Sequence, residues 1–216
     1  MTTTNETHPD VDNLDALIER LGGRDWRDVG AAVESLHQAS DAGRNAALRA
    51  LLTHPDARVR KGCADFMDHH GDDSCVPALA QAARHDSIAY VRRVAVHSLG
   101  CQRCKAAPLE TDFVNLLIEV IEKDENARVR REAVYSLSQQ KPDARIAAFL
   151  ARLLNDPAVA DAELKKGAHF ALKRHDPDYR RMVDERARNA SRARHEAARA
   201  QLPAPLPEPS AEKAVG

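Results

Sequence analysis

Aromatic side chains are scarce in this sequence. Phe, Trp and Tyr together make up 4% of its 216 residues, too little to fill the bulky core of an ordinary globular domain of this length. The sequence is rich instead in Ala, Leu, Val and Arg, and small or medium apolar side chains suit thin layers of closely packed helices. The composition therefore favours stacked pairs of helices.

Long apolar runs and a basic leader are also lacking. The first ten residues contain neither an apolar stretch nor a Lys or Arg, which argues against a secretory signal, and no later segment is apolar enough to predict a membrane span. We therefore expect a cytoplasmic protein without a membrane partner. In that reducing compartment the four cysteines are expected to be thiols or metal ligands rather than disulfides.

The sequence also lacks a large excess of positive or negative charge. The formal charge of the whole chain is -1, so there is no global attraction to nucleic acid or to an anionic membrane. The charge is nevertheless uneven, because residues 1–42 carry an acidic excess and residues 173–200 a basic one. The two ends of the chain are electrically opposite.

A five-residue motif occurs four times, at intervals of 32, 38 and 35 residues. It consists of an apolar residue, two basic residues, any residue and a small residue, and a large apolar side chain follows four positions later. This spacing puts apolar, small and apolar side chains on one helical face. An amphipathic stretch precedes each motif, which predicts two helices per repeat. The motifs are Val59–Cys63, Val91–Ala95, Val129–Ala133 and Leu164–Ala168.

The motif resembles the HEAT repeats, in particular the short bacterial type also found in phycobilisome bilin lyases. Over residues 43–175 the match includes the loop Asp six residues before the first Arg, as in Asp86 to Arg92. The resemblance implies an all-α, right-handed α-solenoid of helix pairs, with the motif helices on its concave face. It also implies that the first basic residue of each motif binds loop carboxylates.

The expected organisation has four parts. Residues 1–12 form a flexible N-terminus, and residues 13–176 form the solenoid, with an N-terminal helix pair and about four repeats. Residues 177–201 form an Arg/Ala-rich helix, and residues 202–216, with alternating prolines, form a disordered tail.

The second basic residue of each motif is less committed to the structure than the first. These residues recur at one position in successive repeats, so they would line one face of the solenoid. We interpret them as a stripe that contacts a partner. They are Lys61, Arg93, Arg131 and Lys166.

Cysteine and histidine gather at one edge of the predicted solenoid. The 32-residue register aligns His69 with Cys101, and Cys75 and Cys104 lie in the same two turns. Three thiols and an imidazole form a closed tetrahedral set for a structural zinc ion. The set is His69, Cys75, Cys101 and Cys104, with His70 and His97 in reserve.

Two other interpretations of this edge stay open: cysteines without a ligand, and a redox or reactive dithiol at Cys101 and Cys104. Against the redox interpretation, Cys101 follows a helix instead of starting one, so the helix dipole does not favour its thiolate. The edge sequence is also similar to that of bacterial HEAT-repeat proteins with a Cys-x-x-Cys turn, and no activity comes with that similarity.

Function is expected to be binding rather than catalysis, because repeat solenoids offer a long surface but no deep, water-excluding cleft. The main hypothesis is a scaffold or adaptor for a protein partner. One alternative is a bilin-lyase-like or other thiol-dependent enzyme. Another is nucleic-acid binding by the C-terminal helix, which aligns four arginines on one face: Arg181, Arg188, Arg192 and Arg199.

Overall fold

The computed structural model describes residues 13–200, and the expectations for residues 1–12 and 202–216 lie outside this range. Within it the chain forms eleven α-helices and no strand. The predicted all-α solenoid is thereby confirmed. Its helices are α1 (Leu14–Arg20), α2 (Trp26–Gln38), α3 (Ser40–Thr53), α4 (Ala57–His70), α5 (Val76–His85), α6 (Ala89–Gly100), α7 (Val114–Lys123), α8 (Ala127–Gln139), α9 (Ala144–Asn155) and α10 (Ala162–His175). The eleventh helix, α11 (Pro177–Ala200), belongs to a second compact unit and is described by itself.

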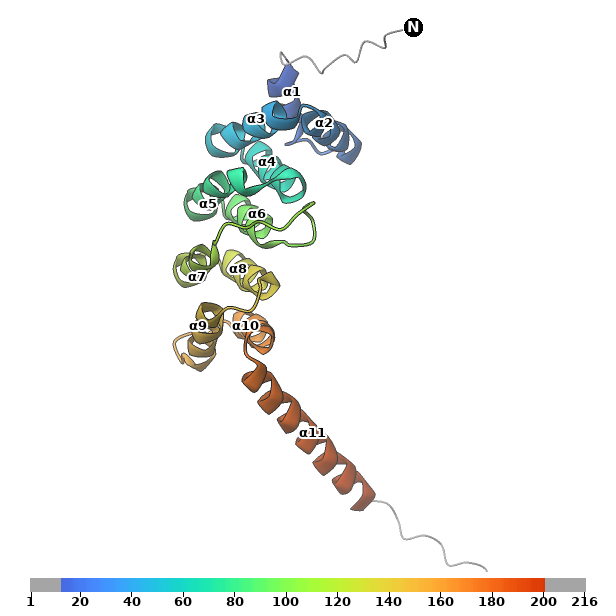
Figure 1. The fold of residues 1–216 in the computed structure, drawn as a ribbon, viewed down its shortest axis with the longest axis vertical. Helices are drawn as coiled ribbons and strands as arrows, with labels where there is room; N and C mark the ends of the chain where they lie inside the picture. Colours follow the sequence, from blue (N-terminus) through green and yellow to red (C-terminus); the bar gives the residue numbers. More distant parts are fainter. Residues whose placement is uncertain (1–12, 201–216) are drawn as a thin grey trace, which may run out of the picture. The chain divides into compact units, whose positions relative to one another are not determined.

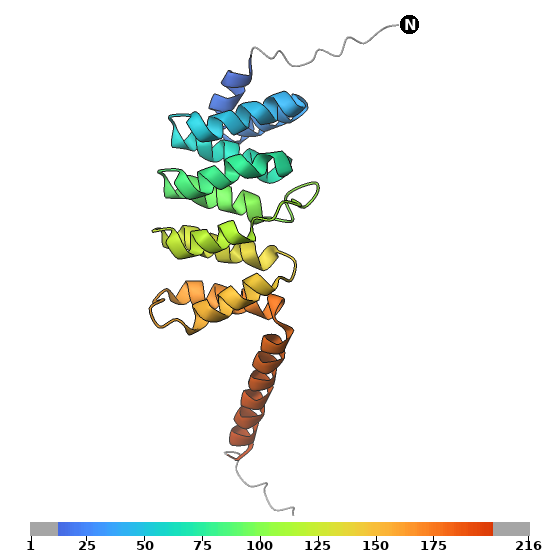
Figure 2. The same cartoon turned by 60° about the vertical axis from the view of Figure 1, so that its left-hand side comes forward.

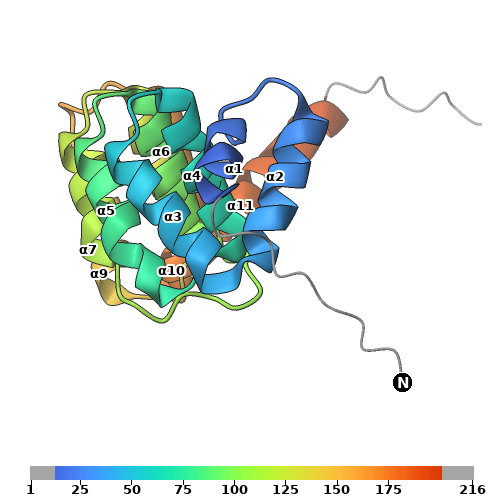
Figure 3. The same cartoon turned by 90° about the horizontal axis from the view of Figure 1, so that it is seen from above.

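Four helix pairs follow α1 and α2 as stacked layers, from α3 and α4 to α9 and α10 (Figures 1 and 2). Viewed along the stack, the first helix of each pair lies on one side and the second helix on the other (Figure 3). The second helices pack closely against one another, whereas neighbouring first helices make few contacts. A stack of such layers curves toward its tighter side, so α4, α6, α8 and α10 form the concave face.

The motif positions explain why the second helices can approach so closely. In α6 the apolar, small and apolar residues Val91, Ala95 and Leu99 are all fully buried. Buried serines add direct links between helices, because the Ser98 hydroxyl donates to the Ala64 carbonyl at 2.8 Å. Small side chains at the contact and satisfied polar atoms together allow native packing density.

In the first three motifs the first basic residue ties one repeat to the next, whereas Lys165 in the fourth donates to the Asp156 carbonyl of its own loop at 2.8 Å. Arg60 donates to the Asp86 carboxylate at 2.7 Å, and Arg92 donates to Asp124 at the same distance. Arg92 also donates to the backbone carbonyl of Asp86 at 2.9 Å, six residues before it. Each guanidinium therefore binds its own loop through a carbonyl and the following loop through a carboxylate, as the HEAT resemblance implied.

A loop of thirteen residues, 101–113, separates α6 from α7 and accounts for the longest repeat interval. Asp73 anchors its far end by accepting hydrogen bonds from the backbone N–H groups of Glu110 and Thr111, at 3.0 and 2.6 Å. At its near end the Lys105 side chain is only 1% exposed and donates to the Ser98 carbonyl at the end of α6. A cation there complements the negative end of the helix dipole.

Candidate metal centre and concave face

Four potential metal ligands converge where the ends of α4 and α6 meet the 101–113 loop. Asp68 comes from the last turn of α4, His97 from the last turn of α6, Cys101 from the residue after α6, and Cys104 from the loop. One ligand atom from each lies within 4.8 Å of every other. The cluster therefore joins two neighbouring repeats and the loop inserted between them.

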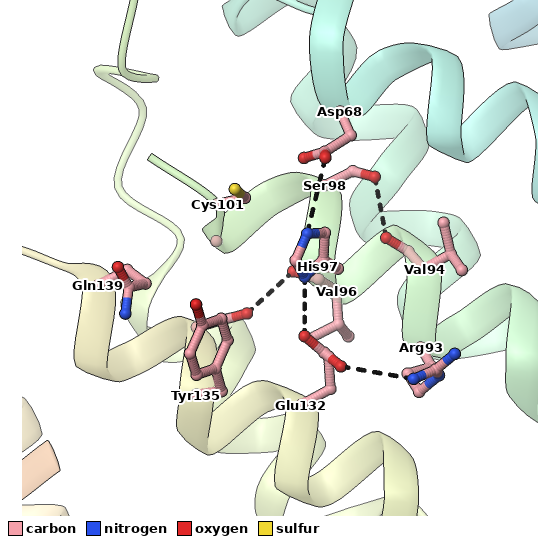
Figure 4. Close-up of polar contacts among 12 residues, drawn as sticks. Asp68, Arg93, Val94, Val96, His97, Ser98, Cys101, Glu132, Tyr135 and Gln139 are labelled. Atoms are coloured by element: carbon pink, nitrogen blue, oxygen red, sulfur yellow. Dashed lines mark hydrogen bonds and ion pairs between the residues drawn. The ribbon is translucent and has the colours of Figure 1, made fainter. Parts of the chain in front are cut away.

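The His97 ring lies between two carboxylates, Asp68 on α4 and Glu132 on α8 (Figure 4). Its Nδ1 is 2.8 Å from Glu132 Oε1, and its Nε2 is 3.6 Å from Asp68 Oδ2. The hydrogen bond to Glu132 raises the pKa of His97, against the opposing effect of burial. With the Nδ1 hydrogen donated to Glu132, the Nε2 lone pair faces the cluster, as in carboxylate–histidine–metal triads.

Asp68 is a buried carboxylate, with 7% of its side chain exposed. Its Oδ1 is 3.4 Å from the Lys105 ammonium, while Oδ2 faces His97. A buried charge needs such a partner, because desolvation without compensation is costly. Lys105 therefore neutralises the Oδ1 side of this carboxylate, and Oδ2 is left directed toward His97 and the cluster.

The Sγ atoms of Cys101 and Cys104 are 3.0 Å apart, and both residues are free thiols. Burial alone would raise the pKa of Cys101, but the hydrogen bond between the thiols and the backbone N–H groups of Arg103 and Cys104 outweigh it, so the pKa is lowered. The same thiol–thiol bond, followed by burial, raises the pKa of Cys104. The pair is thus poised to share one negative charge.

The geometry of the cluster fits a tetrahedral ion with a modest adjustment. Ligands at usual zinc bond lengths would place nitrogen and oxygen about 3.4 Å apart and two sulfurs about 3.8 Å apart. The His97 to Asp68 separation of 3.6 Å is close to the first value. The thiols would have to open by roughly 0.8 Å, which rotation of the Cys104 side chain on its loop can supply. Two thiolates, an imidazole and a carboxylate are all ligand types that zinc accepts.

The residues that converge in this cluster are only partly those predicted from sequence as metal ligands. Cys101, Cys104 and the reserve His97 are brought together, but Cys75 is fully buried with its Sγ 3.3 Å from the Met67 sulfur. His69 is 60% exposed, with its Nε2 3.8 Å from Asp68 Oδ2, and the His70 ring lies tilted against that of His37 with ring centroids 4.3 Å apart. A helix turns by about 100° per residue, so the side chain of α4 that reaches the cluster is Asp68, one position before His69, the residue chosen by register.

The predicted basic stripe lies on the second helices, and each of its cations has a carboxylate neighbour. Lys61 pairs with Asp65, Arg93 is 3.8 Å from Glu132, Arg131 is 2.8 Å from Asp161, and Lys166 is 3.9 Å from Glu163. The stripe is therefore a surface of mixed charge. These pairs could not be predicted from sequence, because two of the carboxylates, Glu132 and Asp161, come from other repeats.

Exposed aromatic side chains accompany the stripe and were not among the residues predicted from sequence. Tyr135 and Phe170 follow Arg131 and Lys166 by four residues, one helical turn on, and are 48% and 61% exposed. Trp26, which lines a cleft of about 470 Å³ together with Lys61, is 75% exposed. The sequence does contain a sign of them: an aromatic residue follows the stripe residue by four positions in two motifs, and residues i and i+4 share a helix face.

No helix within residues 13–200 has the length and apolar character needed to cross a membrane. No curated protein matches the sequence. Fourteen chains of known structure do match, among them one in the complex of CpcE and CpcF of phycocyanin lyase from Nostoc sp. PCC7120. That chain is 19% identical, with a TM-score of 0.58, and the match covers 75% of this chain and 99% of that one; it shows similarity of fold.

The comparison with protein families gives two overlapping matches to the HEAT repeats, at residues 14–100 and 76–173. The matched span contains α1 to α9 and most of α10, and with them the repeated motif, the arginines that link successive repeats and the helix pairs. The chain therefore belongs to the HEAT-repeat family.

Proposed function

We propose that this chain is a scaffold that binds a protein partner along its concave face and is stapled by a structural zinc ion. The observation that carries the binding role is the row of exposed aromatic side chains on that face. Hot spots of protein–protein interfaces are enriched in large aromatic residues and arginine, and both occur side by side here. The partner is therefore expected to contribute apolar groups as well as charge.

The ion pairs along the stripe refine this proposal. Lys61, Arg93, Arg131 and Lys166 remain the proposed partner contacts, but their carboxylate neighbours make the face unsuited to a uniform polyanion. Paired charges at the rim of an interface set orientation and specificity more than affinity. The similar fold of a chain from the CpcE–CpcF complex supports a role in assembly with another protein.

The zinc proposal rests on the preformed cluster of Asp68, His97, Cys101 and Cys104. Four protein ligands complete a tetrahedral shell, so no position is left for a substrate or a reactive water, and the role is structural. An ion there would link α4, α6 and the 101–113 loop. Most residues of the loop are partly or fully exposed, so it gains most from such a link.

A thiol-dependent enzyme is the second candidate, favoured by the lowered pKa of Cys101 beside a second thiol 3.0 Å away. This arrangement suits disulfide exchange as well as metal binding. The two candidates differ in what the pair holds after purification under reducing conditions. Zinc that is lost when Asp68 is changed supports the staple, whereas metal-free protein that cycles between dithiol and disulfide supports the enzyme.

The zinc test measures metal content per chain in the wild type and in Asp68→Asn, His97→Ala and Cys104→Ser. We expect about one zinc in the wild type and a loss of at least tenfold in affinity in each variant. Cys63→Ala is the matched control, because Cys63 is a fully buried core thiol in α4 that lies outside the cluster. Metal-free wild type, or variants that retain zinc, would refute the site.

The partner test compares the double variant Tyr135→Ala and Phe170→Ala with the control Leu52→Ala. Leu52 lies on a first helix and is 36% exposed, so its loss removes apolar surface from the opposite side of the solenoid. Proteins captured from the source cell should be lost at least tenfold in the double variant and retained by the control. Equal capture by all three proteins would reject the concave face.

A further inference from the structure

Helix α11 carries a set of cations that the proposed scaffold does not use. All seven of its cationic residues are arginines, and it contains no lysine. Two of them, near its start, pair with carboxylates: Arg181 with Asp178, and Arg180 with Asp184 at 3.8 Å. Within the part of the chain that the structure describes, no carboxylate pairs with the remaining five, Arg186, Arg188, Arg192, Arg194 and Arg199.

The second half of α11 is therefore an exposed cationic rod. From Arg186 to Arg199 it carries five arginines against the single acid Glu196, and all six side chains are exposed. A cation near a helix C-terminus interacts favourably with the helix dipole, but that effect is confined to the last turn. It accounts for Arg199 and leaves the other four arginines unexplained.

These arginines occupy two opposite sides of the helix. At about 100° per residue, Arg188, Arg192 and Arg199 fall within about 40° of one another. Arg186 lies about 160° from Arg188, and Arg194 about 160° from Arg192. An acidic protein surface would meet one of these sides, whereas a groove bordered by two rows of phosphates would meet both.

We propose that α11 binds double-stranded DNA by lying in its major groove, with arginines directed to the phosphates of both strands. A helix with its side chains is about 10–12 Å across, and the major groove of B-form DNA is about 12 Å wide. Alanine occupies many of the positions between the arginines, which keeps the rod slim. Guanidinium groups can bind phosphate through two hydrogen bonds at once.

The same helix lacks the features of other polyanion binders. Single-stranded nucleic acid is held largely by stacking of bases on aromatic side chains, and α11 has no aromatic residue after Tyr179. A membrane-surface helix needs a broad apolar face, and the second half of α11 offers only alanine. In the proposed complex the arginines contact phosphates, so the affinity should be largely independent of base sequence.

The test uses the full chain and a 20-base-pair duplex DNA, with fluorescence anisotropy at increasing salt. Neutralising four or five phosphates predicts a slope of log affinity against log salt near −4, so affinity falls roughly two orders of magnitude between 50 and 200 mM. The triple variant Arg188→Gln, Arg192→Gln and Arg194→Gln should bind at least tenfold more weakly at low salt. Glutamine keeps helix propensity, and circular dichroism checks that the helix remains.

The matched control removes three exposed cations from the first helices of the solenoid, by Arg49→Gln, Lys123→Gln and Arg152→Gln. It should leave DNA binding within twofold of the wild type, since net charge is reduced equally. Three outcomes would overturn the proposal: no duplex binding at 50 mM salt, equal weakening in the control, or single-stranded RNA or polyglutamate competing as well as duplex DNA. None of them bears on the scaffold proposal, which concerns other helices.

Discussion

The four cysteines show how strongly the surroundings of a residue decide its chemistry. Cys63 stands where the other repeats have alanine and is fully buried. This burial raises the pKa of its thiol to about 12. Burial also raises the pKa of Cys75. Thiolate is the reactive form, so these two thiols are expected to be inert in the folded protein.

Alkylation should therefore divide the cysteines into two pairs. After chelation of metal, iodoacetamide at neutral pH should modify the Cys101–Cys104 pair, through the thiolate that the lowered pKa of Cys101 provides, while leaving Cys63 and Cys75 unmodified, and all four should react in denaturant. Peptide mass spectrometry gives the rate at each site, and we expect at least a hundredfold difference between the pairs. Modification of Cys63 at the rate of Cys101 would contradict the packing described for α4.

Titration of His175 should make the stability of the folded protein depend on pH. Burial lowers its pKa, and the neutral ring is used fully: Nδ1 accepts from the Asp143 N–H at 3.3 Å, and Nε2 donates to the Leu137 carbonyl at 2.9 Å. The unfolded chain thus binds this proton at higher pH than the folded one. The stabilisation is complete above the unfolded pKa of about 6.5 and is lost as pH falls through the folded value.

Urea unfolding from pH 7.5 down to pH 5 should show this loss in the wild type. His175→Gln should unfold with a flatter pH dependence, because it removes the titrating group while keeping a donor and an acceptor. The exposed His85→Gln serves as the control and should retain the wild-type slope. Identical slopes in the wild type and His175→Gln would assign the pH dependence to other groups.

At the scale of the helix, glycine marks the closest contact between second helices. A Cβ on Gly100 at the end of α6 would overlap the side chain of Ser136 on α8. Gly100→Ala should therefore destabilise the protein by about 1–3 kcal/mol through overpacking. Gly30→Ala in α2, where a Cβ meets nothing within 4 Å, should stabilise by about 0.5–1 kcal/mol through helix propensity. Denaturant unfolding of both variants checks the opposite signs.

The helix pairs could be predicted from sequence because their signal is local. Val91, Ala95 and Leu99 repeat along one face of a helix, and the same pattern returns in every repeat. The candidate metal cluster could not be predicted in full, because it depends on which side chain of the last helical turn faces inward and on the path of the 101–113 loop. Asp68 and Glu132 are common surface residue types, and only the packing of α4 and α8 against α6 gives them a role.

For the solenoid as a whole, each pair of helices contacts mainly the pairs before and after it. Stability in such an array is a sum over repeats and their interfaces, so a local change spreads only to neighbours. The proposed zinc ion joins α4, α6 and the 101–113 loop, far along the stack from α9 and α10. Its removal should therefore loosen one region and leave the other unchanged.

Hydrogen–deuterium exchange measures this directly. Chelation should speed amide exchange in the last turns of α4 and α6 and in residues 101–113, with no change in α9 and α10, because the former lose a cross-link and the latter keep every contact. Cys104→Ser should show the faster exchange already without chelator and should respond to it no further. A uniform change along the solenoid would mean that the ion stabilises the protein globally, and no change would mean that the cluster holds no metal.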